Sequence, residues 1–394
     1  MTTASKPPAT TIALASCLEA QLNLSSKGYL AGIIVGLLTL FMFGGKQLFQ
    51  IGEYAPLYAA ARLVGTPDLY DKARNTQEQI NAVGASGGDV LIYSRPPFVA
   101  AFMAPLGKLP YRASLLIFQG LSFLALIGFI LLWPNSNRWL TALACAWSLP
   151  MALVFAFVRE GTFLLLLLAL IFRLYKRRPL ITGLLMSLLG IKFHLFLLLP
   201  LLFIGQRRWR MAAGFATGCT ALLGISFTVA GSDWPARMAE VIKTSTIEKQ
   251  YLLPNIRGIL QSVTDSLIPE VIIGIIVAVV VFRLVSRSGF EYGLCAALVG
   301  SLLVSHHAGI YDCVLLIPIL LILGNGEARS AMWCFALLSP APYALVSFGS
   351  VPGLLAKLGI VSLLALIHLH LAHSRSWASA SIRESRALAP DPAV

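Results

Sequence analysis

The chain has 394 residues, of which 57% are hydrophobic and only 12% are charged, and its formal net charge is +13. A soluble globular domain carries about twice that charged fraction, so the composition excludes an ordinary soluble protein. Several apolar runs reach the roughly 17–25 residues that a helix needs to cross a bilayer. We therefore expect an all-α, polytopic membrane protein.

The basic residues lie in short segments between apolar runs, most clearly at 173–178, 207–210 and 283–287. This distribution follows the positive-inside rule and places these segments in the cytoplasm. The sequence contains no nucleic-acid-binding motif, so no nucleic-acid partner is predicted. None of the six cysteines belongs to a C-x-x-C pair, which argues against a disulfide framework or a zinc site.

The first expected elements are a cytoplasmic segment over 1–27 and an uncleaved membrane anchor over 28–43, because no small-residue cleavage signature follows. Residues 44–112 then form a large first external loop with interfacial helices. Further spans are expected at 113–133, 139–158, 162–175, 211–230, 268–285, 292–304, 310–323, 331–348 and 351–372. The polar tail 374–394 is expected to be disordered in the cytoplasm, which leaves 28–373 as one transmembrane domain.

Residues 180–204 form an apolar segment that has basic flanks on both sides. If both flanks are cytoplasmic, the segment enters the membrane and returns as a short re-entrant helix pair, bent near Gly190–His194. Each arm, at about 1.5 Å per residue, would reach about half-way across. The alternative is a single tilted span, which would invert the later half of the protein.

With the re-entrant pair, about ten full spans place both termini in the cytoplasm. The second large loop, 231–267, is then external, together with Arg159-Glu160, His306-His307 and Tyr311-Asp312. The charge rule and the gathering of polar candidates on one face come from different residues, and they agree.

Glu53 is the first candidate for chemistry, because a carboxylate at the membrane boundary can act as a general base toward a hydroxyl. It could equally be a solvated interfacial acid that pairs with Lys46 or Arg62. Several tyrosines follow it in the first loop: Tyr54, Tyr58, Tyr70 and Tyr93. Their rings and hydroxyls suit a sugar, although an aromatic belt at the bilayer interface has the same composition.

Three cationic or titratable side chains could contact a phosphate. Arg95 precedes tandem prolines and an apolar stretch that ends at Pro110, which predicts a helix lying in the interface. Its guanidinium could hold a phosphate or an ordinary lipid headgroup. Lys192 and His194 lie in the middle of an apolar segment, where ionisable groups are functional candidates. The alternative for Lys192 is snorkelling from a misplaced boundary.

Later candidates lie close to the ends of apolar runs. Asn255 and Arg257, in the second external loop, fit sugar hydroxyls and phosphate respectively, or are simply solvated. A polar group also joins two later spans, namely His306, His307, Tyr311 and Asp312. Adjacent histidines on a helix point about 100° apart, so we expect polar lining of a substrate cavity here and no metal site.

These motifs, in this order, resemble glycosyltransferase family 87, a family of integral-membrane GT-C enzymes. The matching blocks are Glu53-Tyr54, Tyr58-Ala59-Ala60, Gly65–Asp71, Tyr93–Phe98, Pro105–Pro110, Gly183–Lys192, Asn255–Gly258 and Tyr311-Asp312. The similarity covers roughly residues 28–345. Two positions depart from the family pattern: Glu53 stands where Asp is usual, and Phe193 stands where a proline often follows the lysine.

The resemblance implies a GT-C-like membrane domain that transfers a sugar from a polyprenyl-phosphate donor to an acceptor hydroxyl, with inversion. The sugar would be mannose or another hexose or pentose, and the acceptor a lipid or a glycan. The site would lie on the external, periplasmic side of a bacterial plasma membrane, in the cell envelope. No cofactor or metal would be required, because cations can neutralise the leaving phosphate.

The resemblance also assigns roles to residues. Glu53 would be the catalytic base. The donor phosphate would be bound by Lys192, His194, Arg95 and Arg257. The sugar or the acceptor would be contacted by Tyr54, Tyr58, Tyr93, Asn255, His306, His307, Tyr311 and Asp312. Two other readings stay open: a transporter or flippase of a lipid-linked saccharide, which would need the cations but no base, and a structural subunit of an envelope-assembly complex.

Overall fold

A computed structural model describes the chain from Tyr54 to Val346, with gaps, and six single positions beyond it. The described ranges are 54–83, 91, 93–134, 138–244, 253–261, 264, 266–324 and 328–346, with 357, 360, 361, 364, 365 and 367. Within them every regular element is helical. Glu53 and the expected anchor over 28–43 lie outside the described residues, as do most of the last expected span and the tail.

Four helical segments are long and apolar enough to cross a membrane: α6 (Tyr111–Leu132), α10 with its continuation (Pro179–Phe196), α12 (Trp209–Ala230) and α15 (Ile268–Ser286). A fifth crossing is possible if α7 (Arg138–Trp147) and α8 (Leu149–Ala156), bent by 70°, count as one span. We expected about ten spans. The described residues supply four or five by length and composition.

The remaining apolar helices are shorter than a bilayer requires. They are α5 (Pro97–Gly107), α9 (Gly161–Leu174), α16 (Phe290–Val304) and the continuous pair η4 (Ile310–Leu315) and α17 (Leu316–Leu323). The expected span over 331–348 is divided between α18 (Ala328–Leu338) and α19 (Pro340–Val346). Pro340 accounts for this break, since proline removes a backbone donor and clashes with the preceding turn.

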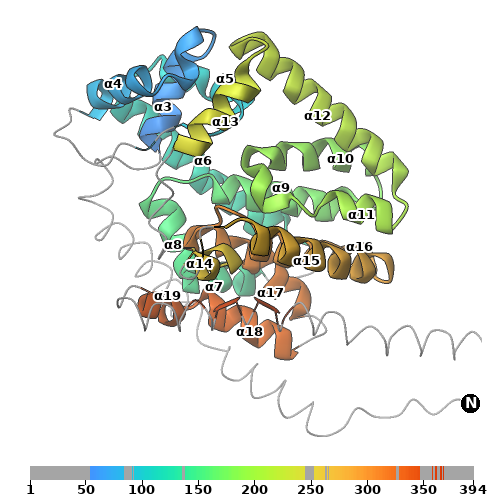
Figure 1. Ribbon diagram of the computed structural model, residues 1–394. Helices are drawn as coiled ribbons and strands as arrows, with labels where there is room; N and C mark the ends of the chain where they lie inside the picture. Colours follow the sequence, from blue (N-terminus) through green and yellow to red (C-terminus); the bar gives the residue numbers. More distant parts are fainter. Residues whose placement is uncertain are drawn as a thin grey trace, which may run out of the picture.

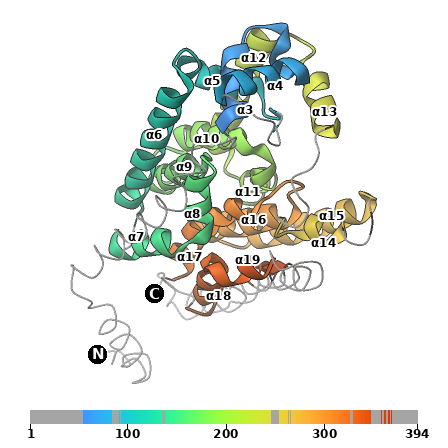
Figure 2. The ribbon, with the colours of Figure 1, turned by 90° about the vertical axis from the view of Figure 1, so that its left-hand side faces the viewer.

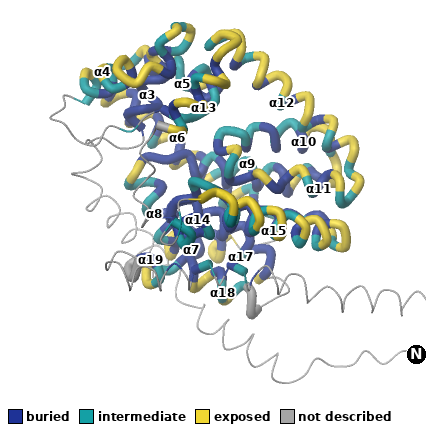
Figure 3. Tube along the Cα trace, viewed as in Figure 1, coloured by how far each residue is buried: buried dark blue, intermediate teal, exposed yellow. Residues whose placement is uncertain are grey.

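The outer faces of the long helices are apolar and exposed. On α15, Ile268 is 69% exposed, Ile275 60% and Val271 57%, and on α6 Leu116 is 63% exposed. Figure 3 shows exposed residues along much of α12 and α15. Contiguous exposed apolar surface of this extent is typical of a face that contacts lipid.

The chain turns back within the segment that carries Lys192. Helix α10 itself ends at Leu188, and the 3-10 segment η2 (Leu189–Phe196) follows it. Lys192 interrupts η2 with non-helical angles, φ −126° and ψ 60°. Helix α11 (Pro200–Gly205) then carries the chain back. The bend expected near Gly190–His194 is therefore present.

Close backbone packing shows where the two arms begin and end. A Cβ on Gly183 would lie 2.0 Å from the carbonyl oxygen of Met211, and one on Gly214 would lie 2.0 Å from that of Leu180. The start of α10 thus packs against the start of α12, which directly follows α11. The pair formed by α10 and α11 therefore begins and ends at the same place, beside the start of α12.

Helices α3 (Tyr54–Leu63), α4 (Lys72–Val83), α5 and α13 (Trp234–Thr244), with the short η1 (Pro67–Tyr70), form a group at one end of the molecule (Figure 1). Small residues let α3 and α5 cross closely, because a Cβ on Gly107 would lie 2.9 Å from the backbone of Ala61. Helices α18 and α19 lie at the other end in both views (Figure 2).

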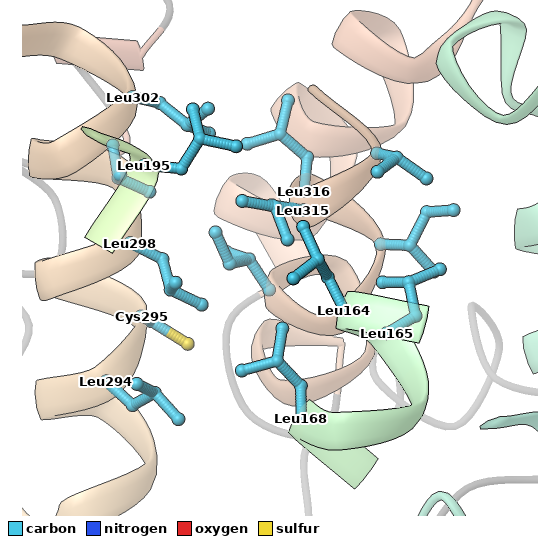
Figure 4. Packing of buried hydrophobic residues seen from close by; sticks show 14 of the residues in the cluster. Leu164, Leu165, Leu168, Leu195, Leu294, Cys295, Leu298, Leu302, Leu315 and Leu316 are labelled. Atoms are coloured by element: carbon cyan, nitrogen blue, oxygen red, sulfur yellow. The ribbon is translucent and has the colours of Figure 1, made fainter. Parts of the chain in front are cut away.

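The main apolar core joins α9, α16 and α17. Leu164, Leu165 and Leu168 of α9 are at most 1% exposed, as are Leu298 of α16 and Leu316 of α17. Figure 4 shows these side chains between the helices. This core fixes the N-terminal ends of α9 and η4, where the polar residues lie.

Candidate active site

Five charged residues from four distant parts of the sequence meet inside the protein. We call them the charge cluster: Arg95, Arg159, Glu160, Lys192 and Asp312. Four of them are 7% exposed or less, with Lys192 at 4%, Glu160 at 5% and Asp312 at 3%. Charged groups are buried only when they are paired, so each must be explained by its partners.

Lys192 and Glu160 each make two ionic contacts. The Lys192 Nζ donates to Asp312 Oδ1 at 2.6 Å and lies 3.4 Å from Glu160 Oε1. The same Glu160 Oε1 accepts a hydrogen bond from Arg95 Nη1. One carboxylate oxygen is therefore shared by two cations. The other oxygen, Glu160 Oε2, has no hydrogen-bond partner among the described residues.

The surroundings of Glu160 act on its pKa in opposite directions. Burial raises the pKa of this carboxyl, because a charged group loses its hydration. Arg95 and then Lys192 outweigh burial and hold the pKa of Glu160 below its ordinary value. Glu160 is therefore ionised at neutral pH and keeps both cations in place.

A strained turn presents Arg159 and Glu160. Val158 has φ 53°, a left-handed conformation that is unfavourable for a β-branched residue. The Arg159 N–H closes this turn by donating to the Val154 carbonyl at 2.8 Å. Gly161 follows, and a Cβ there would lie 2.7 Å from the Val154 side chain. Such strain persists only where the surrounding structure enforces it, often at functional sites.

Tyr311 and Asp312 enter the cluster from the start of η4. Asp312 Oδ2 accepts a hydrogen bond from the Gly309 N–H at 2.9 Å, which orients the carboxylate toward Lys192. The Arg159 guanidinium carbon lies 3.0 Å from the centroid of the Tyr311 ring, and Lys192 Nζ lies 5.0 Å from it. Both cations are thus stabilised by the ring face. Gly309 is needed, because a Cβ there would collide with Tyr311.

A row of histidines leads away from the cluster. The ring centroids of His194 and His307 are 6.4 Å apart, and those of His307 and His306 are 4.6 Å apart. His306 Nδ1 lies 2.7 Å from Glu270 Oε1, and Glu270 Oε2 lies 3.3 Å from Arg257 Nη1. Arg257 is therefore at the far end of this row, in a second ion pair.

The model of glycosyltransferase family 87 matches residues 93–307 of the chain, which is more than half of its length. The chain belongs to glycosyltransferase family 87. No curated protein and no solved structure matches it. Membership of the family and the long apolar helices together make the protein a membrane glycosyltransferase. The match contains Arg95, Glu160, Lys192, Arg257 and His307, all of which belong to the cluster or to the histidine row.

The resemblance to family 87 predicts that the tyrosines of the first loop contact the sugar or the acceptor. In the structure these tyrosines are buried. Tyr54 is 0% exposed and Tyr93 is 2% exposed. The Tyr54 hydroxyl lies 2.5 Å from Ser114 Oγ, and Tyr58 donates to the Leu109 carbonyl at 2.7 Å. Burial raises the pKa of Tyr54 to about 12. These hydroxyls are already engaged with the protein.

Tyr70 and Tyr93 position the segment that carries Arg95. Tyr70 donates to the Arg95 carbonyl at 2.7 Å, and Tyr93 donates to the Pro96 carbonyl at 2.8 Å. The Tyr93 hydroxyl also accepts from the Ala100 N–H at 3.1 Å. The Tyr-x-x-Pro-Pro motif therefore fixes Arg95 at the entrance to α5.

Asn255 has a structural role in the second loop. Its Oδ1 accepts from the Gly258 N–H at 2.9 Å and caps α14 (Ile256–Leu260), while its Nδ2 donates to the Ser305 carbonyl at 2.6 Å. A Cβ on Gly258 would lie 2.0 Å from the Leu253 carbonyl oxygen. The Asn-x-x-Gly motif thus links the start of α14 to Ser305, the residue directly before His306.

The expected base, Glu53, lies outside the described residues, but its neighbour Tyr54 is described. Tyr54 packs in one cluster with Val158, and its ring centroid is 5.0 Å from that of Phe118. Phe118 in turn contacts Phe163, at 5.5 Å between centroids. The first residue of α3 therefore belongs to the same apolar cluster as Val158, in the turn that carries Glu160.

Sequence reasoning placed Arg159-Glu160 on the external side but gave neither residue a role in the site. The structure puts Glu160 between two of the predicted phosphate ligands. The available signal was a charged pair directly after the apolar run that ends at Val158. A buried carboxylate is the expected neighbour of an intramembrane lysine such as Lys192.

Proposed function

We propose that this membrane glycosyltransferase moves a hexose or pentose, with mannose the first to test, from a polyprenyl-phosphate donor to an acceptor hydroxyl. The reaction would invert the anomeric centre and take place on the periplasmic face of a bacterial plasma membrane. The observation that carries the proposal is the buried charge cluster, in which Arg95 and Lys192 converge on one oxygen of Glu160.

Arg95 and Lys192 are the residues that would bind the donor phosphate. Both bring N–H donors to one point, and cations held in a water-poor site stabilise a leaving phosphate far better than they would in water. Asp312 holds Lys192 in position through the 2.6 Å contact. His194 and His307 are half-buried beside the cluster and would contact the donor or the acceptor next to the phosphate.

Glu53 would act as the general base. It would take the proton of the acceptor hydroxyl while the oxygen attacks the anomeric carbon, and the bond from that carbon to the phosphate oxygen breaks. A single displacement of this kind inverts the centre. Support for this role comes from the family resemblance, in which an acid precedes the aromatic residue at the start of the first loop; here that pair is Glu53-Tyr54.

The distribution of basic residues supports the proposed sidedness. Gln206 donates to the carbonyls of Val285 and Ser288, which brings the basic segments 207–210 and 283–287 to the same end of the molecule. Lys192 lies at the opposite end of the returning arm, α11. With the basic end in the cytoplasm, the charge cluster would open to the other side, and the apolar faces of α12 and α15 would accommodate the prenyl chain.

Purified protein in detergent, given radiolabelled polyprenyl-phosphate sugars and a lipid or glycan acceptor, tests the proposal. We expect label to move covalently to the acceptor, and Glu53→Gln to abolish this transfer while donor binding and the unfolding temperature stay near wild type. A flippase would instead carry label across reconstituted vesicles on the intact donor. Label that crosses the bilayer without ever leaving its polyprenyl phosphate would refute the transferase.

A further inference from the structure

The unused oxygen of Glu160 is the feature that the proposed reaction leaves unexplained. Glu160 is 5% exposed, its Oε1 is shared by Arg95 and Lys192, and its Oε2 has no hydrogen-bond partner among the described residues. A buried ionised acceptor without a donor is uncommon in native proteins, so its hydrogen-bond donor is expected to come from outside the described residues.

The chemistry of that partner is restricted by charge. Oε2 is a negatively charged acceptor, so a phosphate oxygen would be repelled there, and only a group with an N–H or O–H can satisfy it. The donor phosphate is expected at Arg95 and Lys192, on the other side of the same carboxylate. In a sugar phosphate, the hydroxyl next to the anomeric carbon is the ring donor closest to the phosphate.

We propose, on the basis of the proposed function, that Glu160 recognises the transferred sugar. Its Oε1 aligns Arg95 and Lys192 under the donor phosphate, and its Oε2 accepts a hydrogen bond from the sugar hydroxyl adjacent to the anomeric carbon. Glu160 is therefore a specificity-determining residue, which couples the position of the phosphate to that of the sugar ring.

The neighbouring contacts favour this division of roles. Asp312 uses both of its oxygens inside the protein, on Lys192 and on the Gly309 N–H. The Lys192 ammonium has three N–H groups, and its two carboxylate contacts leave one for the phosphate. Glu160 Oε2 is thus the carboxylate oxygen of the cluster that is available to a sugar.

The test compares binding of two donors, polyprenyl phosphates that carry mannose or its 2-deoxy analogue, with polyprenyl phosphate alone as the measure of phosphate binding. A hydrogen bond from a hydroxyl to a buried carboxylate predicts that wild type binds the 2-hydroxy donor about 10- to 100-fold more tightly than the 2-deoxy donor. Glu160→Gln is expected to reduce that ratio below about threefold, because a neutral amide forms a much weaker hydrogen bond with the sugar hydroxyl than a charged carboxylate does.

A second variant keeps the inference testable if Glu160→Gln fails to fold. Glu160→Asp keeps the charge but withdraws the carboxylate by one methylene, so it should lose most of the discrimination while its affinity for polyprenyl phosphate alone stays close to wild type. Asp233→Asn, a change in an exposed carboxylate that pairs with Arg237 at the surface, is the matched control and should keep the full ratio.

Two outcomes overturn the inference: a wild-type protein that binds both donors equally, or Glu160 variants that weaken both donors by the same factor, as a merely structural residue would. The proposed function is tested separately by transfer. Discrimination in binding without transfer to any acceptor would refute the transferase and leave the Glu160 contact standing. Transfer at equal kcat/KM for both donors in all variants would refute the Glu160 contact and leave the transferase standing.

Discussion

Substitution of Lys192 tests separately what the charge cluster contributes to the stability of the protein and to donor binding. Its ammonium lies 2.6 Å from Asp312 Oδ1, and each side chain is 4% exposed. At an effective dielectric constant of about 20, two unit charges at that distance attract by about 6 kcal/mol, much of which desolvation offsets. Lys192→Met removes the charge at similar length and leaves Asp312 with the hydrogen bond from the Gly309 N–H.

We expect Lys192→Met to lower the free energy of unfolding by about 3–5 kcal/mol, because it leaves a buried carboxylate without the cation that it contacts directly. The double variant with Asp312→Asn removes that carboxylate charge and should recover at least half of the loss. Glu160 keeps Arg95 in both variants.

Donor affinity should behave differently. Loss of a charged phosphate contact weakens donor binding by about 10- to 100-fold, in the single and in the double variant alike. Denaturant titration in mixed micelles measures stability, and equilibrium binding of the donor measures affinity. A Lys192→Met protein as stable as wild type would refute the ion pair. Recovery of donor binding in the double variant would refute Lys192 as a phosphate ligand.

Four further predictions concern other parts of the molecule. Gly183→Ala should destabilise the protein by several kcal/mol, since its Cβ would lie 2.0 Å from the Met211 carbonyl, whereas Gly120→Ala has open space and should be tolerated. Tyr93→Phe should cost about 1–2 kcal/mol of stability and raise the donor KM through Arg95, which steady-state kinetics will show. Glu160 contributes stability that is complete above its ordinary pKa of 4.5 and is lost only as pH falls through its lower folded pKa, so a stability profile of Glu160→Gln should match wild type's shape between pH 5 and 8. Cysteine at Gln77 should react with an impermeant reagent from outside and cysteine at Arg210 should not; the reverse pattern would invert the proposed topology.

The long helices could be predicted from sequence because their signal is local. The expected spans 113–133, 211–230 and 268–285 differ from α6, α12 and α15 by at most two residues at each end. Each is a continuous apolar run with polar or basic flanks, which composition alone identifies. The bend at Lys192 was predictable too, since equal basic flanks cannot both be cytoplasmic around one crossing.

The shorter helices were harder to predict as spans. The expected spans at 162–175 and 292–304 become α9 and α16, of 14 and 15 residues. Both are largely buried among other helices, and a buried apolar helix has the same composition as a lipid-facing one. Apolar content therefore predicted helices here but not whether each of them crosses the bilayer.

The sequence singled out three residues of the charge cluster as candidates, and it missed the meeting of these residues for a physical reason. Arg95, Lys192 and Asp312 were each candidates, but only tertiary structure shows that they meet, since 217 residues separate Arg95 from Asp312. The roles of the tyrosines were ambiguous, because an aromatic that binds sugar and one that fixes a turn have the same sequence signal. Asn255 carried a clearer sign, because an Asn directly before the start of a helix is typical of an N-cap.

The arrangement of the cluster explains how a membrane protein can keep several buried cations in place, as the proposed phosphate site requires. Three cations close together in a low-dielectric interior would repel one another and lose their hydration. Glu160 and Asp312 offset that cost in the empty protein, and the shared oxygen of Glu160 lets Arg95 and Lys192 converge without direct contact. If the proposed donor binds here, its phosphate would meet cations that are already oriented, so little reorganisation would be required when charge develops on the leaving group. On the same proposal, the two carboxylates would also limit how tightly the cations bind a small anion, because a phosphate would share the cations with Glu160 and Asp312.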